Sequence, residues 1–276
     1  MKTKEIQVGG AAIGGTNPLF LVAGPCVIES EDIALETATV LRDACAACGM
    51  PYMFKSSYDK ANRSSINSFR GPGLEKGLDI LARVRDTLGV PVITDVHSPD
   101  EAAAAAKVVD ALQVPAFLSR QTDLLLAAGK TGLPVNVKKS QMMSPAETAN
   151  IVAKLKSTGN DDIILTERGT FFGYHNLVND FTAIAVMRAL GCPVLFDATH
   201  SAQQPGGRGD STGGKREFVP VLARAAVAVG VDGLFIEAHP NPDTALCDGP
   251  NSLRLADIGP LLEQLVEIDR AAGARG

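Results

Sequence analysis

The sequence alternates along most of its length between two patterns, a short apolar run rich in β-branched residues and a longer stretch with helical periodicity. The apolar runs predict strands at residues 20–26, 52–56, 92–96, 111–116, 135–139, 163–168, 194–199 and 233–239. The helical stretches lie at residues 31–48, 74–88, 99–107, 121–130, 145–157, 177–190, 216–229 and 253–272. Eight such units in about 250 residues predict an α/β fold of the (β/α)8 or TIM-barrel class.

The alternative arrangement of alternating strands and helices is a doubly wound open sheet, but no GxGxxG motif follows the first predicted strand. No linker, low-complexity tract or block of charge divides the 276 residues, so we expect residues 1–276 to form a single barrel domain. Residues 6–15 precede the first unit and carry two short apolar runs around Gly9 and Gly10. This pattern predicts a short N-terminal β-hairpin that covers the bottom of the barrel.

The formal net charge of −5 argues against a general affinity for nucleic acids or acidic membranes. No apolar run approaches the roughly 18 residues that span a bilayer, and the first residues lack the apolar core of a signal peptide. Five scattered cysteines do not resemble a disulfide framework. Cys45 and Cys48 have the spacing of a redox pair, but they come late in a helical pattern, which favours simple packing. We therefore expect a cytoplasmic protein with reduced thiols.

Basic residues collect at the carboxyl ends of the predicted strands, where (β/α)8 barrels carry their catalytic groups. They are Lys55, Lys60, Arg63, Arg120, Lys138 and Arg168. Any one of them could be an ordinary surface residue. Six cations at one barrel mouth repel one another unless an anionic ligand supplies the missing charge, and one phosphate needs only two or three. The pattern predicts a site for at least two anionic groups.

A second set of residues at the strand ends suits a metal ion. Cys26 follows the first strand, His200 the seventh, and Glu237 lies on the eighth with Asp248 beyond it. Strand 8 pairs with strand 1 in a closed barrel, so these side chains could meet around Zn²⁺, Fe²⁺ or Mn²⁺. Two alternatives stay open: Cys26 as a buried small hydrophobe, and His239 as a ligand in place of His200. His97 and His175 are expected to be loop residues or neighbours of the site.

Five segments closely resemble one family, the 3-deoxy-D-manno-octulosonate 8-phosphate synthases, also called 2-dehydro-3-deoxyphosphooctonate aldolases. They are residues 55–73, 113–123, 135–139, 166–170 and 235–240. The Lys-Ala-Asn-Arg-Ser-Ser sequence at residues 60–65 distinguishes this family from the related barrel enzymes that make 3-deoxy-arabino-heptulosonate 7-phosphate, for which a Lys-Pro-Arg-Thr type of sequence is expected. The resemblance extends from about residue 20 to the last predicted helix.

The resemblance implies condensation of phosphoenolpyruvate with D-arabinose 5-phosphate and water, in lipopolysaccharide biosynthesis, by a homotetramer. It assigns Lys55, Gln113, Lys138 and Arg168 to phosphoenolpyruvate. It assigns Asn62, Arg63 and Ser64 to the sugar phosphate, with Arg120 reaching across from a neighbouring subunit. Lys60 would lie beside the reacting centre, where we expect it to stabilise developing negative charge, while Asp95 and Asp248 hold sugar hydroxyls.

The resemblance also places the chain among metal-dependent members, because Cys26 stands where metal-free members have Asn. The implied ligands are the four reached above, Cys26, His200, Glu237 and Asp248, with Zn, Fe, Mn or Co as the metal. His200 and Asp248 would thus be both metal-binding and catalytic. The segment 247–250 instead resembles metal-free members, which leaves open whether the metal is strictly required. The alternatives in function are a 3-deoxy-arabino-heptulosonate 7-phosphate synthase and a non-catalytic sugar-phosphate-binding barrel.

Overall fold

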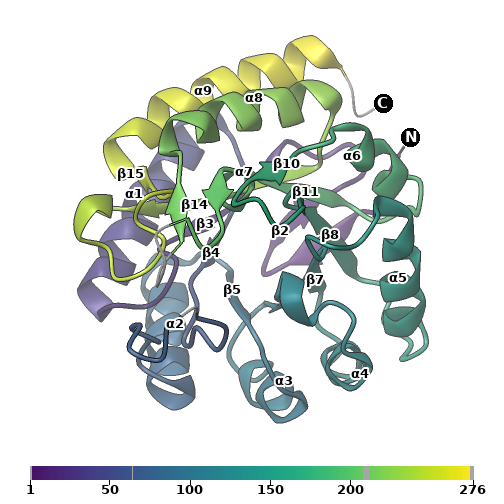
Figure 1. The fold of residues 1–276 in the computed structure, drawn as a ribbon, viewed down its shortest axis with the longest axis horizontal. Coiled ribbons are helices and arrows are strands. Elements are labelled where there is room, and N and C mark those ends of the chain that lie inside the picture. The colour runs from purple at the N-terminus through teal and green to yellow at the C-terminus, as the bar shows by residue number, and fades with distance from the viewer. Residues whose placement is uncertain (1, 64, 208–211, 274–276) are drawn as a thin grey trace.

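Eight parallel strands close into a barrel in the computed structural model, which describes residues 2–63, 65–207 and 212–273 (Figure 1). The barrel strands are β3 (Phe20–Gly24), β4 (Tyr52–Lys55), β5 (Val92–Asp95), β6 (Ala111–Val114), β7 (Val135–Lys138), β8 (Ile163–Glu167), β11 (Val194–Asp197) and β14 (Gly233–His239). Each pairs with its neighbours in chain order, and β14 pairs with both β11 and β3, which closes the ring. The predicted (β/α)8 barrel is confirmed.

Helices surround the barrel, except the short α7, which directly follows β11 and lies over the barrel (Figure 1). They are α1 (Glu31–Cys48), α2 (Leu74–Leu88), α3 (Pro99–Ala105), α4 (Thr122–Lys130), α5 (Thr148–Lys156), α6 (Thr182–Arg188), α7 (Ala198–Ser201), α8 (Val219–Val229) and α9 (Leu255–Ala272). None of the helices in the described ranges is long and apolar enough to cross a membrane.

Helix α1 shows how local sequence sets the boundaries of these elements. The Ser30 hydroxyl accepts a hydrogen bond from the Ile33 N–H at 3.1 Å and caps its start, and Gly49 ends it in the left-handed conformation. Its buried residues include Ala34, Ala38, Leu41 and Cys45, one face at helical spacing. Cys45 is therefore a core residue and Cys48 lies in the last turn, which supports the packing interpretation of that pair.

The loops between the barrel strands and helices contain additional short strands and 3-10 turns. The strands are β9 (Thr170–Phe171), β10 (Leu177–Val178), β12 (Gln203–Gln204), β13 (Gly213–Gly214) and β15 (Leu253–Arg254). The 3-10 turns span Ala116–Leu118, Pro145–Glu147, Arg216–Phe218 and Pro242–Thr244. These pieces lengthen the loops that follow the barrel strands, where active sites of this fold are built.

The helix predicted at 177–190 is too long at its start, because residues 177–178 form β10, which pairs with β9. The Asp180 carboxylate accepts hydrogen bonds from the backbone N–H and the hydroxyl of Thr182, at 2.9 and 2.6 Å. An aspartate that bonds its own backbone in this way favours a turn over helix continuation. The α-helix therefore begins at Thr182.

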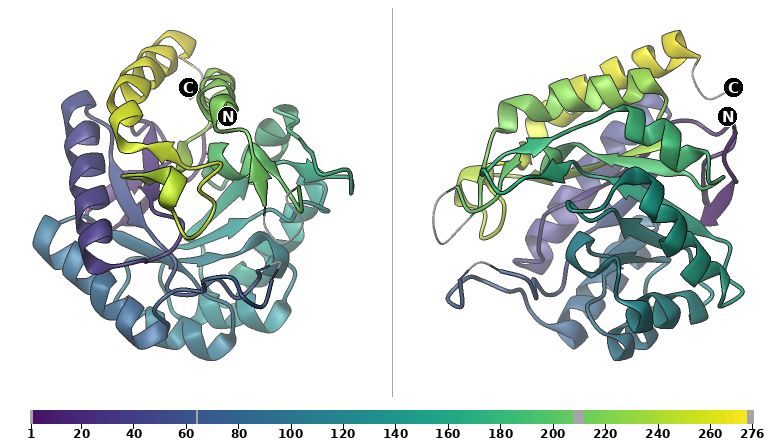
Figure 2. Two further views of the ribbon diagram at one scale, coloured as in Figure 1. Left: turned by 60° about the vertical axis from the view of Figure 1, so that its left-hand side comes forward. Right: turned by 45° about the vertical axis from the view of Figure 1, so that its right-hand side comes forward.

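The barrel interior changes character from one end to the other. At the amino-terminal end of the strands it is apolar, with Phe20, Val22, Met53 and Ile93 in one buried cluster. The hairpin formed by β1 (Ile6–Val8) and β2 (Ala11–Ile13) adds three side chains to this same cluster, Ile6, Val8 and Ile13. The purple hairpin lies at one end of the barrel in the right-hand view of Figure 2. The predicted hairpin at the barrel bottom is confirmed.

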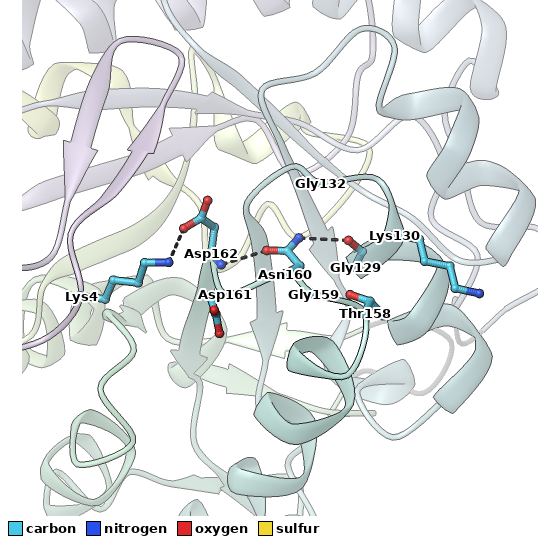
Figure 3. A pocket seen from close by; sticks show the side chains of 9 residues that line it. All are labelled: Lys4, Gly129, Lys130, Gly132, Thr158, Gly159, Asn160, Asp161 and Asp162. Carbon is cyan, nitrogen blue, oxygen red and sulfur yellow. Dashed lines mark hydrogen bonds and ion pairs between the residues drawn. The ribbon is translucent and has the colours of Figure 1, made fainter.

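A cavity of about 310 Å³ lies near the hairpin end, between the chain before β1 and the α5–β8 turn. Figure 3 shows Lys4 directed at Asp162, and the two form an ion pair of 2.8 Å. The Asn160 side-chain amide donates to the carbonyl of Gly129 at 3.2 Å. Lys4, Asp162, Asn160 and Gly129 thus form a chain of contacts, as expected of a structural joint.

Candidate active site

A cavity of about 1120 Å³ lies at the carboxyl ends of the barrel strands. Most of the residues that the sequence predicted for the site line it, namely Lys55, Lys60, Asn62, Arg63, Asp95, Gln113, Lys138, Arg168, His200 and Asp248. Arg120 is exposed and is not among the described lining residues, so five of the six predicted cations share this cavity. Ser64 lies outside the described residues.

Strands β3 and β4 approach each other closely where Lys55 enters the site. A Cβ on Gly24 would lie 2.0 Å from the Lys55 carbonyl oxygen, so only glycine allows this spacing. The Lys55 ammonium lies 3.1 Å from Asp95 Oδ1 and donates to the Ser57 hydroxyl at 2.7 Å. Ser57 in turn donates to Asp95 Oδ1 at 2.5 Å. Lys55 is almost fully buried, and its charge is held by this network.

His97 belongs to the same network, although the sequence suggested only a loop position or a neighbour of the site. Its Nε2 lies 3.1 Å from Asp95 Oδ2 and its Nδ1 lies 3.1 Å from Glu101 Oε2. Burial opposes a positive charge on His97, but these two carboxylates outweigh it and raise its pKa. The spacing of Asp95 and His97, two residues apart at a strand end, was the signal that could have found it.

Lys138 lies deep in the cavity at the end of β7. Its ammonium donates to Asp197 Oδ2 at 2.5 Å and lies 3.5 Å from the centre of the Phe235 ring. Burial lowers the pKa of Lys138, and the nearby Lys55 lowers it further, while Asp197 opposes both effects. Two neighbouring buried lysines, Lys138 and Lys55, favour the binding of an anion between them.

Arg168, after β8, is also buried and only partly bonded. Its Nη2 donates to Gln203 Oε1 at 2.9 Å, whereas its Nη1 has no hydrogen-bond partner among the described residues. Burial lowers the pKa of this guanidinium, so the desolvation is substantial. A buried guanidinium nitrogen without an acceptor is a binding position for an oxygen of a carboxylate or phosphate.

The four predicted metal ligands fall into two groups that share one residue, Asp248, and its Oδ2 atom lies near both groups. It lies 3.3 Å from Cys26 Sγ and 3.6 Å from His200 Nε2. His200 Nε2 is also 3.5 Å from Glu237 Oε1. The ligand atoms of His200, Glu237 and Asp248 all lie within 4.8 Å of one another, as do those of Cys26, Cys247 and Asp248. These are distances at which one ion can contact several donors.

Glu237 provides the test of whether the cluster fits a metal. It is completely buried, and neither carboxylate oxygen has a hydrogen-bond partner among the described residues. A buried carboxylate without donors is costly unless a cation completes it. His239, the alternative ligand, instead lies 3.5 Å from Glu29 and accepts a hydrogen bond from the Asn241 N–H. The imidazole and carboxylates of His200, Glu237 and Asp248 therefore suit a divalent ion, and Cys26 reaches this group through Asp248.

Asp197 holds His200 in place, a role that the sequence analysis did not assign. Its Oδ1 accepts the His200 backbone N–H at 2.9 Å and caps α7, while its Oδ2 lies 2.7 Å from His200 Nδ1. The ring nitrogen left over, Nε2, is the one near Glu237 and Asp248. Such a carboxylate behind a histidine is the usual support of a metal ligand.

Cys247 is a further site residue that the sequence did not assign. Its sulfur lies 2.8 Å from that of Cys26 and 2.6 Å from Arg63 Nη1. Both cysteines are buried, and both are free thiols. Cys247 stands next to the ligand Asp248 in the chain, and this adjacency was the available signal.

The fold and the site define a (β/α)8-barrel enzyme whose mouth joins buried cations to a cluster of sulfur, imidazole and carboxylate donors. The model of the DAHP synthetase I family matches residues 2–273, and the chain belongs to that family.

Individual relatives carry a more specific name, 2-dehydro-3-deoxyphosphooctonate aldolase. Those from Trichlorobacter lovleyi and Citrifermentans bemidjiense are 57% and 58% identical over 267 residues, covering 97% of this chain and 98% of theirs. One from Acidithiobacillus ferrooxidans is 58% identical over 264 residues, covering 96% of this chain and 94% of its own.

Proposed function

We propose that the protein is a 2-dehydro-3-deoxyphosphooctonate aldolase that condenses phosphoenolpyruvate with D-arabinose 5-phosphate and water, giving 3-deoxy-D-manno-octulosonate 8-phosphate and inorganic phosphate. The observation that carries this is the identity of 55–58% over nearly the whole chain to relatives with that name. The product would serve lipopolysaccharide biosynthesis. We expect the enzyme to act in the cytoplasm, where a reducing environment keeps Cys26 available as a ligand.

Phosphoenolpyruvate would bind on the cationic side of the cavity, to Lys55, Gln113, Lys138 and Arg168. The unpaired Nη1 of Arg168 supports this assignment, as does the closeness of Lys138 to Asp197 and His200. The side-chain oxygen Oε1 of Gln113 accepts a hydrogen bond from Asn136 Nδ2 at 3.2 Å. Asn136 Oδ1 in turn accepts one from the Thr166 hydroxyl at 2.7 Å. This chain of hydrogen bonds across β6, β7 and β8 fixes the Gln113 side chain for the ligand.

The sugar phosphate would bind on the loop after β4, to Asn62, Arg63 and Ser64. Asp95, held by Lys55, Ser57 and His97, would orient a sugar hydroxyl. Lys60 is half-buried near Asp95, and although burial opposes its charge, surrounding negative groups raise its pKa, so it stays cationic. Lys60 can then stabilise negative charge that develops at the reacting atoms.

The chemical task is to bring C3 of the enol to the aldehyde carbon of the sugar while water adds at C2 and phosphate leaves. Two phosphate anchors on different strand ends fix this alignment, and binding energy from them is the main source of rate. The buried walls of Lys138, Arg168 and Phe235 exclude bulk water from the phosphoenolpyruvate side.

A divalent metal, Zn²⁺, Fe²⁺, Mn²⁺ or Co²⁺, would be held by Cys26, His200, Glu237 and Asp248. When bound it supplies Lewis acidity at the sugar side of the cavity. The chain itself holds the ligands in position: Asp197 orients His200, and Asp248 adopts a left-handed backbone conformation, with φ of 48°.

We further propose a homotetramer in which Arg120 reaches a neighbouring cavity. Arg120 is exposed and absent from the described lining of its own cavity. Large apolar side chains are exposed on the segments that follow β6, β7 and β8. They include Phe117, Met142, Phe172 and Tyr174, with 62% to 85% of their surface accessible. Such a concentration is typical of a subunit interface. Light scattering of the purified protein would test it, and a monomer would contradict it.

The function is tested by phosphate release from phosphoenolpyruvate with three acceptors: arabinose 5-phosphate, erythrose 4-phosphate and unphosphorylated arabinose. We expect turnover with the first and at least tenfold less with arabinose, since a charge-assisted contact is worth about 1.5 to 3 kcal/mol. Faster turnover with erythrose 4-phosphate would identify the heptulosonate enzyme. No turnover with any acceptor would leave a binding protein. Strong chelation should abolish activity and Mn²⁺ or Zn²⁺ should restore it, whereas full activity in metal-free protein would reject the metal.

A further inference from the structure

We propose that Cys247 is a second sulfur ligand of the metal centre. One ion would then be bound by Cys26 and Cys247 together with the nitrogen and oxygen donors. The inference rests on the proposed metal site and extends it by a residue for which the family resemblance gave no role.

The geometry places the Cys247 sulfur inside the cluster. It lies 2.8 Å from Cys26 Sγ, and the ligand atoms of Cys26, Cys247 and Asp248 are all within 4.8 Å of one another. Asp248 belongs also to the group with His200 and Glu237, so the two groups share one carboxylate. An ion drawn to Asp248 and Cys26 therefore meets Cys247 as well.

The contacts of Cys247 place a cationic side chain against its sulfur. Arg63 Nη1 lies 2.6 Å from the sulfur, and Arg63 Nη2 donates to the Leu246 carbonyl at 3.3 Å. These two contacts hold the guanidinium beside the Cys247 sulfur. A thiol that only filled space would need no such partner.

The backbone also limits where this sulfur can move. The Asp248 carbonyl accepts hydrogen bonds from the Asn251 and Ser252 N–H groups, each at 3.0 Å, which closes the turn after Cys247. The adjacent Cys247 is 4% exposed and packs with Cys26 and Val27 in a small buried cluster. The turn therefore places two neighbouring donors, Cys247 and Asp248, beside Cys26.

A second thiolate changes which metals the site prefers. Two sulfur donors make the site softer, which favours Zn²⁺ over Mn²⁺ relative to a site with one. Each thiol that binds loses its proton to solvent, so metal affinity rises with pH. Arg63, expected to hold the sugar phosphate, would also touch a metal ligand and so connect the two parts of the cavity.

The test uses Co²⁺ alone added to the metal-free full-length protein with a non-chelating reductant present. Thiolate-to-cobalt charge transfer in the near ultraviolet grows with the number of cobalt–sulfur bonds. We expect Cys247→Ser and Cys26→Ser each to retain about half of the wild-type intensity, and Co²⁺ affinity to fall at least about tenfold. Cys48→Ser, in the last turn of α1, is the matched control and should leave the spectrum unchanged.

The outcomes separate this inference from the metal site itself. Full charge-transfer intensity in Cys247→Ser, with the band lost in Cys26→Ser, would reject Cys247 as a ligand and leave the four-residue site intact. Absence of any charge-transfer band in the wild-type protein would reject the metal site and the inference together. Circular dichroism of each variant confirms that the barrel has folded, so a lost band reports ligation.

Discussion

The two ends of strand β14 carry buried carboxylates in opposite surroundings. Asp232, directly before the strand, accepts hydrogen bonds from the Thr3 hydroxyl at 2.9 Å and the Val194 N–H at 2.8 Å, and it pairs with Arg188. Glu237, five residues later and equally buried, accepts no hydrogen bond from the described residues. Sequence and burial make these residues look alike, and only their partners distinguish them.

The comparison separates structural polar groups from functional ones. At the hairpin end, Asp232 and the Lys4–Asp162 pair of Figure 3 find their partners within the chain. At the mouth, Glu237 and the Nη1 of Arg168 have no hydrogen-bond partner among the described residues, although His200 Nε2 lies 3.5 Å from Glu237. An unsatisfied buried polar group costs folding free energy, so one that lies at the mouth is a candidate position for a ligand.

Removing the satisfied carboxylate should have the largest effect, and on stability alone. We expect Asp232→Ala to lose about 3 to 5 kcal/mol, because it leaves Arg188 buried without its partner, and the melting temperature to fall by about 10 °C. Activity per folded molecule should stay at the wild-type level when measured well below the transition. Lys4→Ala, in a pair that is nearly half exposed, is the control and should cost at most about 1 kcal/mol. Lost activity with full stability would make the hairpin end functional.

Arg168→Ala should damage phosphoenolpyruvate use by about 2 to 5 kcal/mol, or about 30-fold to several thousand-fold in kcat/KM. The matched variant Arg63→Ala should chiefly damage use of the sugar phosphate, because the two cations sit at different strand ends. Initial-rate kinetics with each substrate varied in turn would measure both. The same apparent KM raised in both variants would contradict two separate anion pockets.

Glu237→Gln should have the reverse effect of Asp232→Ala. Loss of a charged ligand should lower activity by about 100-fold or more and reduce metal content. The melting temperature of the metal-free protein should not fall, since the charge that is removed accepts no hydrogen bond within the described residues. Elemental analysis and calorimetry would measure these. Wild-type metal content together with a lower melting temperature would make Glu237 a structural carboxylate like Asp232.

The smallest effect concerns His97, which lies at the mouth but is satisfied on both ring nitrogens. Because the pKa of His97 is raised in the folded protein, its protonated form stabilises the fold below about pH 6.5, and this contribution disappears as the pH rises through the folded-state pKa. His97→Gln should therefore lose about 1 kcal/mol at low pH and less at high pH. Urea unfolding between about pH 5.5 and 9 would show it, and a constant difference would contradict the assignment.

Much of the architecture followed from local sequence patterns. Eight runs of β-branched residues separated by helical stretches predicted the barrel, and the apolar hairpin at Ile6–Val8 and Ala11–Ile13 predicted its covered bottom. Strand ends marked Lys55, Lys138 and Arg168 for the mouth, because side-chain position along a barrel strand determines which end it serves. The error at residues 177–181 arose where Asp180 bonded to its own backbone and changed the local preference.

The sequence by itself therefore determined the fold, and it predicted anionic ligands and four donors suited to a metal, since periodicity and residue chemistry are local properties. Tertiary structure alone decided the partners of each group. It placed His239 near Glu29 and Asp197 behind His200, and it left Glu237 without a hydrogen bond from the described residues. It also brought Cys247 to Cys26 across 221 residues, because the pairing of β14 with β3 closes the barrel and the loop after β14 folds back over its mouth. Contacts between distant segments depend on how the whole chain packs, and no local pattern contains them.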